Sequence, residues 1–585
     1  MDWLDSVLAK DQNSIGEVNN NGSEEEQIEL VIVDDENILF TDFTELIKEL
    51  RSIKKESQKL NPEEMTEYKK LMSNLLPPKS LESSRTKMAG KRRNKKASYY
   101  KGKDYGDSGM FVFEYRLKEC PGLLSVLKHY EHKQPFKGVQ ITGCLHMTQE
   151  TINLAYTLHR LGAEVRWASS NPYSSNDTSV FTCIKQFEPK ITLFGHKNIQ
   201  YIIRLHCSLL ELLDRQSIYV HIRLTNICRH INGRVLDDGC YVYSMILHGK
   251  ELEDKYNATG ELYKLAELDA MDRDKIALFK FLNHIVPKNP HFFNNLVKRI
   301  VGLSEETTSG LSEFRKFEKV NKLLFPIYST NDVISKSKFD NNYGARYSSI
   351  DGVHRGAEGI LIGGREVVVI GYGHVGKGVC MGFRGAGAIV KVCEADPLCA
   401  MQSVMDGYPV VLLEDTLETA DIFITATGGI EVIRLHHVRK MKDGAILGNI
   451  GQGDREIFMA EIVKDPNLEI IELNNNSHYY KFKDLNKGVV ILSHGRLYNL
   501  GCANGHPSLV MSMSFTTQFF ALMQLYENRG KLDKTIHDMP KALDETIARF
   551  HLEALNAKLT VLTDNQCEFL GIKKEGPYKH ERYTY

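Results

Sequence analysis

The stretch Val367–Gly378, VVVIGYGHVGKG, decides the fold of this chain. Its leading apolar residues predict a buried strand, and the glycines at 371, 373 and 376 predict a sharp turn into a helix. In such a fingerprint Gly371 makes the tight turn, Gly373 lets the backbone approach a pyrophosphate, and Gly376 lets helix and strand pack closely. The helix N-terminus offers N–H groups to a phosphate. We therefore expect an α/β fold with a Rossmann unit, a doubly wound parallel sheet that binds a dinucleotide.

A carboxylate stands where such a unit needs one. Glu394 ends the next predicted strand, AIVKVCEADP (388–397), where it can accept hydrogen bonds from both ribose hydroxyls. Because it would repel the additional phosphate of NADP, the expected cofactor is NAD. The alternative is a glycine turn that binds no ligand. His374 lies inside this turn, where the alternative interpretation is an ordinary surface side chain.

The segment before the fingerprint, NDVISKSKFDNNYG (Asn331–Gly344), carries Lys336 and Asp340. Residues four apart share one face of a helix, so these two would form a pair that handles protons beside a hydride acceptor. A lysine serves as a base only where desolvation lowers its pKa. The alternative is a surface ion pair on a helix.

Composition excludes several classes of function. The chain has 585 residues, 42% of them hydrophobic and 25% charged, with a net charge of −1, which is ordinary for a protein of two or three globular domains and gives no attraction to nucleic acid or membrane. Its eleven cysteines lack paired spacing and indicate reduced thiols. We predict no metal site, no membrane span and no signal peptide, and we expect a cytoplasmic (cytosolic) protein.

The chain divides into four predicted regions. Residues 1–105 mix an acidic patch (23–37) with a basic run (Lys87–Lys96) and are expected to be largely disordered. The basic run is either a nuclear-import signal or, more commonly, a solvated tail. Strands and helices then alternate, which predicts parallel sheets covered by helices. We expect a substrate-binding α/β domain at 106–345 plus 505–550, an inserted Rossmann domain at 346–504 with a strand at VVLLED (410–415), and a C-terminal tail at 551–585. The polar helical stretch Lys250–Asn295 reads as an insertion.

Seven motifs occur in an order that resembles the S-adenosylhomocysteine hydrolase family over residues 107–585. They are GCLHMT (143–148), LDDG (236–239), SEETTSG (304–310), NDVISKSKFDN (331–341), GYGHVGKG (371–378), NLGCANGHPS (499–508) and GPYKHERYTY (576–585). The extension is similar in kind to the adenosylhomocysteinase-like branch, some members of which are binding regulators without hydrolase activity. The resemblance implies a hydrolase that reversibly converts S-adenosyl-L-homocysteine to adenosine and homocysteine, in the S-adenosylmethionine cycle of one-carbon metabolism.

The resemblance also assigns chemistry to residues. A permanently bound NAD oxidises the ribose 3′-hydroxyl, which acidifies the C4′ proton so that homocysteine leaves from C5′, water adds and the ketone is reduced again. Lys336 and Asp340 would take the 3′-hydroxyl proton, and Glu306 would hold the 2′-hydroxyl. His146 and Asp238 would act as general acid and base at C4′ and C5′.

The remaining assignments concern binding. The adenine side would be held by Thr148, Glu150 and His506. The nicotinamide and its ribose would be positioned by Thr307, Thr308, Ser309, Asn341 and Asn499. The rest of the cofactor site would comprise Gly371, Gly373, His374, Val375, Gly376, Glu394, Thr427, Gly428, Ile450 and Gly451. The tail would place Lys579 and Tyr583 in a neighbouring subunit's cofactor site, which implies an obligate oligomer, usually a tetramer.

Several positions depart from the family pattern. Cys240 and Tyr241 replace a glycine and an aspartate, and Gln452 replaces a histidine. Further replacements are His374 for an acid, Gly429 for an asparagine and Asn176 for a glutamine.

Alternative interpretations stay open. Asp237 and Asp238 are explained equally well as helix caps, Glu306 as a first-turn charge and His146 as a satisfied polar residue. For the whole chain the alternatives are an NAD-bound paralogue that regulates or hetero-oligomerises with the true hydrolase, and a dehydrogenase acting on a hydroxy acid.

Overall fold

The computed structural model describes residues 106–170, 191–194, 233–268, 273–451, 455–474, 476–581, 583 and 585. All of these belong to one compact unit, formed by Ser98–Lys197 and Gln216–Tyr585. The predicted extension 1–105 with its basic run, and the substituted positions Asn176 and Gln452, lie outside the described residues. Within the described ranges no helix is both long and apolar enough to cross a membrane.

The first sheet, sheet A, has seven parallel strands in the order β14-β6-β5-β4-β1-β2-β3. The stretches QITGC, EVRWA and GRVLD form β1, β2 and β4. The bounds are β1 Gln140–Cys144, β2 Glu164–Ala168, β3 Ile191–Phe194, β4 Gly233–Asp237, β5 Ile300–Glu305, β6 Ile327–Ser329 and β14 Ile536–His537.

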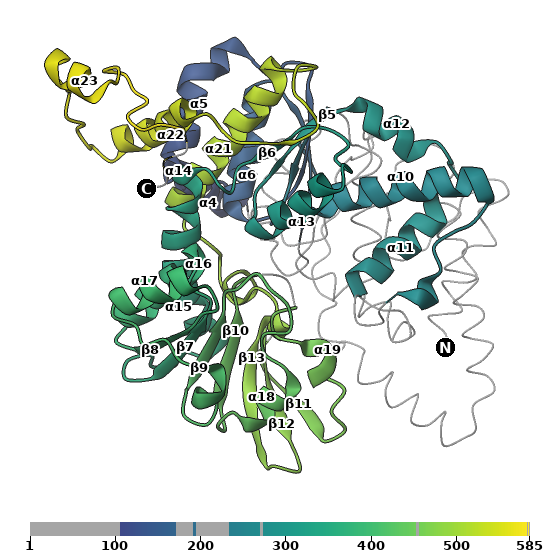
Figure 1. The fold of residues 1–585 in the computed structure, drawn as a ribbon, viewed down its shortest axis with the longest axis vertical. Helices are drawn as coiled ribbons and strands as arrows, with labels where there is room; N and C mark the ends of the chain where they lie inside the picture. Colours follow the sequence, from purple (N-terminus) through teal and green to yellow (C-terminus); the bar gives the residue numbers. More distant parts are fainter. Residues whose placement is uncertain are drawn as a thin grey trace, which may run out of the picture. The chain divides into compact units, whose positions relative to one another are not determined.

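Helix α21 (Ser508–Glu527) supplies much of the core of this sheet. It contains no glycine or proline, and its apolar residues lie all round its surface, which is the pattern of a helix buried on every side. Phe515, Phe519 and Leu522 are essentially inaccessible and pack in the same cluster as Ile141 and Val165 of sheet A. Figure 1 shows α21 beside α5 and α6, in keeping with their contacts. The neighbouring helices are α4 Gly106–Lys118, α5 Pro121–Tyr130, α6 Gln149–Arg160 and α22 Lys541–Ala554.

The stretch interpreted as an insertion is helical. It is occupied by α10 Tyr241–Thr259, η3 Leu265–Glu267, α11 Arg273–Ile285 and α12 Phe292–Arg299, and after β5 the chain continues into α13 Thr308–Lys319. Buried Glu253 of α10 accepts hydrogen bonds from the backbone N–H groups of Phe293 and Asn294, at 2.5 and 2.8 Å, and so caps the start of α12.

The second sheet, sheet B, has the order β11-β12-β13-β10-β9-β7-β8. Its strands β8, β7, β9, β10 and β13 are mutually parallel, as the Rossmann prediction requires, whereas β12 runs antiparallel to both of its neighbours. The bounds are β7 Glu366–Ile370, β8 Ile389–Cys393, β9 Ile422–Thr425, β10 Ala445–Asn449, β11 Leu468–Asn474, β12 Ser477–Phe482 and β13 Lys487–Leu492. The predicted α/β fold class is therefore confirmed.

The strand predicted at VVLLED is wrong. Only Val410 forms a bridge, to Val392, and the chain then enters the 3₁₀ turn η5, Leu413–Thr416. Leu412 is 68% exposed, so the apolar letters do not mark a buried segment. The acidic pair that follows favours the turn over a further sheet partner.

The strands of sheet B all lie between β6 and β14 in the sequence, which is the connectivity of an inserted unit. The domain boundaries at 346, 505 and 551 stay predictions. The helices on this part of the chain are α14 Ile334–Ser337, the π-helical turn η4 Asp340–Gly344, α15 Ala345–Gly356, α16 His374–Gly385, α17 Pro397–Met405, α18 Leu435–Lys440, α19 Met459–Ile462 and α20 Tyr498–Gly501, with α23 Asp564–Leu570 in the C-terminal tail.

The turn from β7 into α16 has the geometry that its glycines predict. Gly371 adopts φ of 104°, a conformation that side chains rarely allow. A Cβ at Gly376 would lie 1.9 Å from the carbonyl oxygen of Gly371, so helix and strand can meet this closely only through a glycine.

Replacing Gly376 with alanine tests this packing. Because the methyl group meets backbone and not a movable side chain, we expect the free energy of unfolding to fall by about 1–3 kcal/mol. Gly385→Ala in the same helix is the matched control, since its methyl group would have no neighbour within 4 Å, and we expect a gain of about 0.5–1 kcal/mol there. Urea unfolding measures both variants, and equal losses would contradict the close packing.

Candidate active site

A cavity of about 480 Å³ is lined by loops that follow the carboxyl ends of strands from both sheets. Such crevices are where open α/β sheets bind their ligands. The lining includes all five residues predicted to be catalytic. It also includes most of those predicted to bind substrate or cofactor, namely Thr148, His506, Thr307, Thr308, Ser309, Asn341, Gly373, His374, Val375, Thr427, Gly428, Ile450, Gly451 and Asn499. The remaining predicted site residues lie outside the lining: Glu150, Gly371, Gly376, Glu394, Lys579 and Tyr583.

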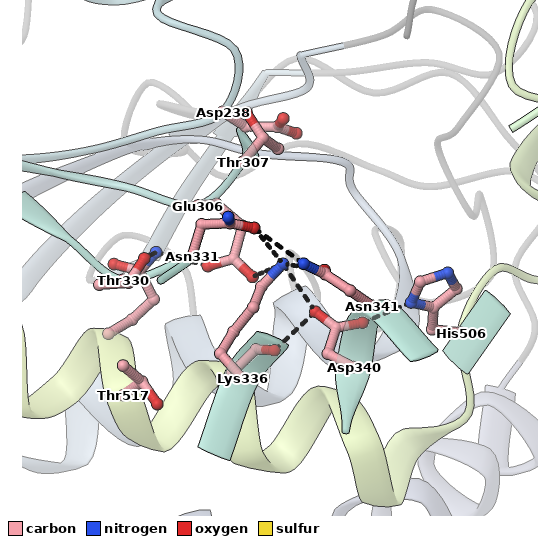
Figure 2. A network of polar contacts seen from close by, with 12 residues as sticks. Asp238, Glu306, Thr307, Thr330, Asn331, Lys336, Asp340, Asn341, His506 and Thr517 are labelled. Carbon is pink, nitrogen blue, oxygen red and sulfur yellow. Dashed lines mark hydrogen bonds and ion pairs between the residues drawn. The ribbon is translucent and has the colours of Figure 1, made fainter. Parts of the chain in front are cut away.

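Lys336 forms the centre of a buried polar network, shown in Figure 2. The single turn of α14 followed by η4 brings its Nζ within 3.1 Å of Asp340, as the four-residue spacing predicts. The same Nζ donates to Asn341 Oδ1 at 2.7 Å and to Asn331 Oδ1 at 3.4 Å. Glu306 Oε1 lies 3.7 Å away. Lys336 is 4% exposed, which excludes the alternative of a surface ion pair.

The protonation of this network differs from the expectation for a lysine base. Burial alone would lower the pKa of Lys336, but the carboxylates of Asp340 and Glu306 outweigh it, and the pKa is raised. The condition for a lysine base, a pKa lowered by desolvation, is therefore not met by these surroundings. Burial would raise the pKa of Asp340, but Lys336, His506 and Ser514 overcome it and hold that pKa well below its usual range.

Glu306 has the opposite environment. Burial raises its pKa to about 7, against the lowering effect of the Lys336 charge. Gln518 donates to Oε2, at 2.5 Å, while buried Oε1 has no hydrogen-bond partner among the described residues. Glu306 precedes Thr307, the N-cap of α13, so it is not a charge in the first helical turn. A buried carboxylate oxygen that faces a cavity and has no hydrogen-bond donor can accept a hydrogen bond from a hydroxyl group.

His146 and Asp238 form a second contact in the cavity. His146 Nε2 lies 3.3 Å from Asp238 Oδ2, to which Ser170 also donates at 2.9 Å. The helix-cap alternative applies to Asp237 alone, because its carboxylate accepts from the N–H groups of Val242 and Tyr243 at the start of α10. The two adjacent aspartates therefore have different roles: the Asp237 carboxylate caps the start of α10, and Asp238 faces the cavity.

The residues predicted for the adenine side make different contacts in the structure. His506 Nδ1 contacts Asp340 and so belongs to the lysine network. Thr148 lines the cavity and is the N-cap of α6. Glu150 is buried outside the lining, where it accepts from Ser508 at 2.7 Å and lies 3.8 Å from Arg116. Roles in substrate binding stay predictions for all three.

The glycine turn fits a dinucleotide phosphate. Gly373 is the N-cap of α16 with no side-chain cap, and a Cβ placed there would meet nothing within 4 Å. The backbone at the helix N-terminus is therefore open to the cavity. Asn499, 4% exposed, has a buried Oδ1 without a hydrogen-bond partner among the described residues, as the site of a carboxamide would require.

Two predicted cofactor residues near this turn lie differently from expectation. Glu394 does not line the cavity. Its carboxylate accepts from the backbone N–H groups of Tyr372, Ala395 and Asp396, at 2.6 to 2.9 Å. His374 does line the cavity, so its interpretation as an ordinary surface side chain is wrong, and burial together with Lys338 and Lys377 lowers its pKa.

The tail residues lie away from the cavity of their own chain. Lys579 Nζ is 4.9 Å from the ring centroid of Tyr583, and Lys541 donates to the Tyr583 carbonyl at 3.2 Å. Their action in a neighbouring subunit stays a prediction.

Comparison with known proteins bears on this site. A model of the S-adenosyl-L-homocysteine hydrolase family matches residues 101–584. The chain belongs to this family. The adenosylhomocysteinases of Plasmodium yoelii yoelii and Plasmodium chabaudi chabaudi are each 40% identical to it, over 82% of this chain and 97% of the relative. Among solved structures, the A chain of dipicolinate synthase from Bacillus subtilis is 8% identical, with a TM-score of 0.32, over 66% of this chain and 97% of that one.

Of the departures from the family pattern that the structure describes, Cys240 and Tyr241 directly follow the turn that carries Asp238. Tyr241 lines the cavity, and Cys240 is buried at the N-cap of α10 with φ of 62°, a conformation in which glycine would be unstrained. Gly429 N donates to Thr427 Oγ1 at 2.9 Å. None of these substitutions removes a member of the predicted catalytic set.

Sequence reasoning missed four buried residues around the site: Asn331, Glu305, Glu456 and Gln518. Asn331 and Glu305 stand inside quoted motifs, and the doubled acids DD and EE at the ends of β4 and β5 were the available signal. Because successive strand residues point to opposite faces, only one acid of each pair can face the cavity. Gln518 lies in α21, where the mostly apolar sequence indicated core packing and gave no signal of a site residue.

Asp340→Asn tests whether the network depends on this ion pair. Removing the partner leaves the Lys336 charge buried, so we expect the free energy of unfolding to fall by about 3 kcal/mol or more. Asp351→Asn is the control, because its pair with Arg355, also four residues apart, is exposed and is expected to contribute less than about 1 kcal/mol. Similar losses in denaturant unfolding of both variants would contradict the prediction.

Glu306 should make stability fall as the pH approaches neutrality. Its folded pKa of about 7 lies above the ordinary value of 4.5, so its contribution is fully present below pH 4.5 and is lost as the pH rises to about 7. We expect the unfolding free energy of the wild type, minus that of Glu306→Gln, to fall by about 2–3 kcal/mol between pH 4.5 and 8. A difference independent of pH, measured by urea unfolding, would contradict this.

Proposed function

We propose that this chain is an adenosylhomocysteinase, which reversibly hydrolyses S-adenosyl-L-homocysteine to adenosine and L-homocysteine. The observation that carries the proposal is the buried network of Lys336, Asp340 and Glu306, which faces the same cavity as the glycine turn and as His146 with Asp238. Family membership over residues 101–584 supports the reaction class.

NAD is the proposed resident cofactor. When bound it would accept a hydride from the ribose C3′ and later return it, so that the net reaction is hydrolysis. The turn from Gly371 to Gly376 would hold its phosphates, and Asn499 would orient its carboxamide. The remaining holders are Thr307, Thr308, Ser309, Asn341, Thr427, Gly428, Ile450 and Gly451. Glu394, at the end of β8, would hold a ribose after giving up part of its backbone contacts.

The two acid–base sets would act at different atoms of the substrate. Lys336 and Asp340 would take the proton of the 3′-hydroxyl, while Glu306 Oε1 accepts from the 2′-hydroxyl. The carboxylates of Asp340 and Glu306 raise the pKa of Lys336, so it would act as a base only after its own proton has moved to another group. Glu306 lies 3.7 Å from its Nζ. His146 and Asp238 would move protons at C4′ and C5′.

The regulatory alternative receives no support from the described residues, because the predicted acid–base set is complete. For the assembly we propose, on the family resemblance, a homotetramer in which Lys579 and Tyr583 reach a neighbouring subunit. We propose a cytosolic location, which is consistent with the finding that no disulfide joins the cysteines that the structure describes.

Two variants separate the steps of the proposed reaction. Full-length protein with NAD should release homocysteine from S-adenosylhomocysteine and should develop NADH absorbance when adenosine alone is added. Lys336→Met is expected to lose both signals, because both begin with removal of the 3′-hydroxyl proton. His146→Asn is expected to keep the absorbance and to lose hydrolysis by roughly 10²–10⁴-fold.

Wild-type protein that holds NAD but gives neither homocysteine nor NADH would refute the function. Loss of both signals in His146→Asn would refute only the division of roles.

A further inference from the structure

Glu305 is a buried glutamate that faces away from the cavity and joins two of its loops. Its side chain accepts four hydrogen bonds and is inaccessible to solvent. Oε1 accepts from the N–H of Gly239 at 2.8 Å, and from the N–H and hydroxyl of Thr307 at 2.9 and 2.7 Å. Oε2 accepts from the N–H of Cys240 at 3.1 Å. One carboxylate thus bridges the turn after β4 and the turn after β5.

These two turns carry opposite ends of the proposed chemistry. The turn after β4 presents Asp238, beside His146, and the turn after β5 presents Glu306, beside Lys336. Strand pairing aligns the last residues of the strands, Asp237 and Glu305, and one further backbone hydrogen bond runs from the N–H of Glu306 to the carbonyl of Asp237 at 3.0 Å. Beyond that bond, the Glu305 carboxylate joins Gly239 and Cys240 of the first turn to Thr307 of the second.

The residues packed around the Glu305 carboxylate restrict it to one position. A Cβ at Gly310 would lie 2.2 Å from Glu305 Cδ, so the first turn of α13 packs directly against the Glu305 side chain. Burial, together with the nearby Asp237, raises the pKa of Glu305 to about 8. Its hydrogen bonds come from backbone N–H groups and a hydroxyl, and no ion pair of Glu305 is found among the described residues. Burying a carboxyl group in this way is unfavourable in free energy. We therefore expect the group to contribute through the backbone contacts that it makes.

The second sheet contains the same arrangement. Inaccessible Glu456 accepts from the N–H and hydroxyl of Thr427 at 3.0 and 2.9 Å, and from the N–H of Gly428 at 2.8 Å. In both sheets a glutamate from one loop fixes the backbone of the neighbouring loop that lines the cavity.

We propose that Glu305 is a positioning residue that sets the distance between Asp238 and Glu306, and that it thereby couples elimination at C5′ to binding at the ribose. This inference rests on the proposed function. Glu305 lies outside the cavity lining, and it would act through the backbone of Gly239, Cys240 and Thr307.

Glu305→Gln in the full-length protein tests the proposal, because the variant keeps the size of the side chain but turns an NH₂ group toward at least one backbone N–H. We expect kcat for hydrolysis to fall by roughly 10²-fold, as small misplacements of reacting groups do, with KM changed less than about threefold. Amide hydrogen exchange should quicken at residues 239 and 240. Glu305→Asp, which keeps the carboxyl group but not the reach, should fall between wild type and Glu305→Gln, and it serves where the glutamine variant does not fold.

Glu253→Gln is the matched control, since Glu253 is an equally buried glutamate that binds two backbone N–H groups outside the cavity lining. It should quicken exchange at residues 293 and 294 without lowering kcat. Glu305→Gln that keeps wild-type kcat would overturn the proposal, as would unchanged exchange at residues 239 and 240. If wild-type protein shows no hydrolysis, the proposed function fails, while the exchange measurement still decides whether Glu305 holds the two turns.

Discussion

The ion pair between Lys336 and Asp340 is the interaction on which the site depends. Burying an ammonium group is unfavourable by several kcal/mol unless a partner and hydrogen bonds replace water. Here Asp340 supplies the partner charge, and Asn331 and Asn341 supply acceptors. Asp340 is held in turn by Ser514 of α21 and by His506, so the network ties the segment before sheet B to the segment after it.

The arrangement around this pair explains why two acids follow one another at two strand ends. A cavity that must hold a carboxylate at a fixed place also needs the backbone of the loop to be fixed. Asp237 and Glu305 use their oxygens on backbone N–H groups, which leaves Asp238 and Glu306 to face the cavity. In each pair of adjacent acids, the first is thus hydrogen-bonded to backbone N–H groups and the second faces the cavity.

Local patterns predicted local structure well. The glycine turn, the strands beside it and the Lys336–Asp340 spacing follow from a few neighbouring residues, and the structure confirms their geometry. The meeting of His146, Asp238, Glu306 and Lys336 came from the family resemblance alone, since four distant segments carry them. The raised pKa of Lys336 could not be predicted, because it depends on the extent of burial and, besides Asp340, on Glu306, which is distant in the sequence. The separate tasks of Glu305 and Glu306 depend on the pairing of β4 with β5, which one strand's sequence does not reveal.

The place of α21 in the chain has a consequence for synthesis. This helix fills the core of sheet A and contributes Ser514 and Gln518 to the site, yet it follows every strand of sheet B in the sequence. On the ribosome, the strands β1 to β6 therefore emerge long before the helix that covers them. Sheet B is complete first, and the unfinished sheet A exposes apolar surface of the kind that chaperones recognise. A nascent chain stalled before residue 508 should consequently be the form of this protein most prone to aggregate.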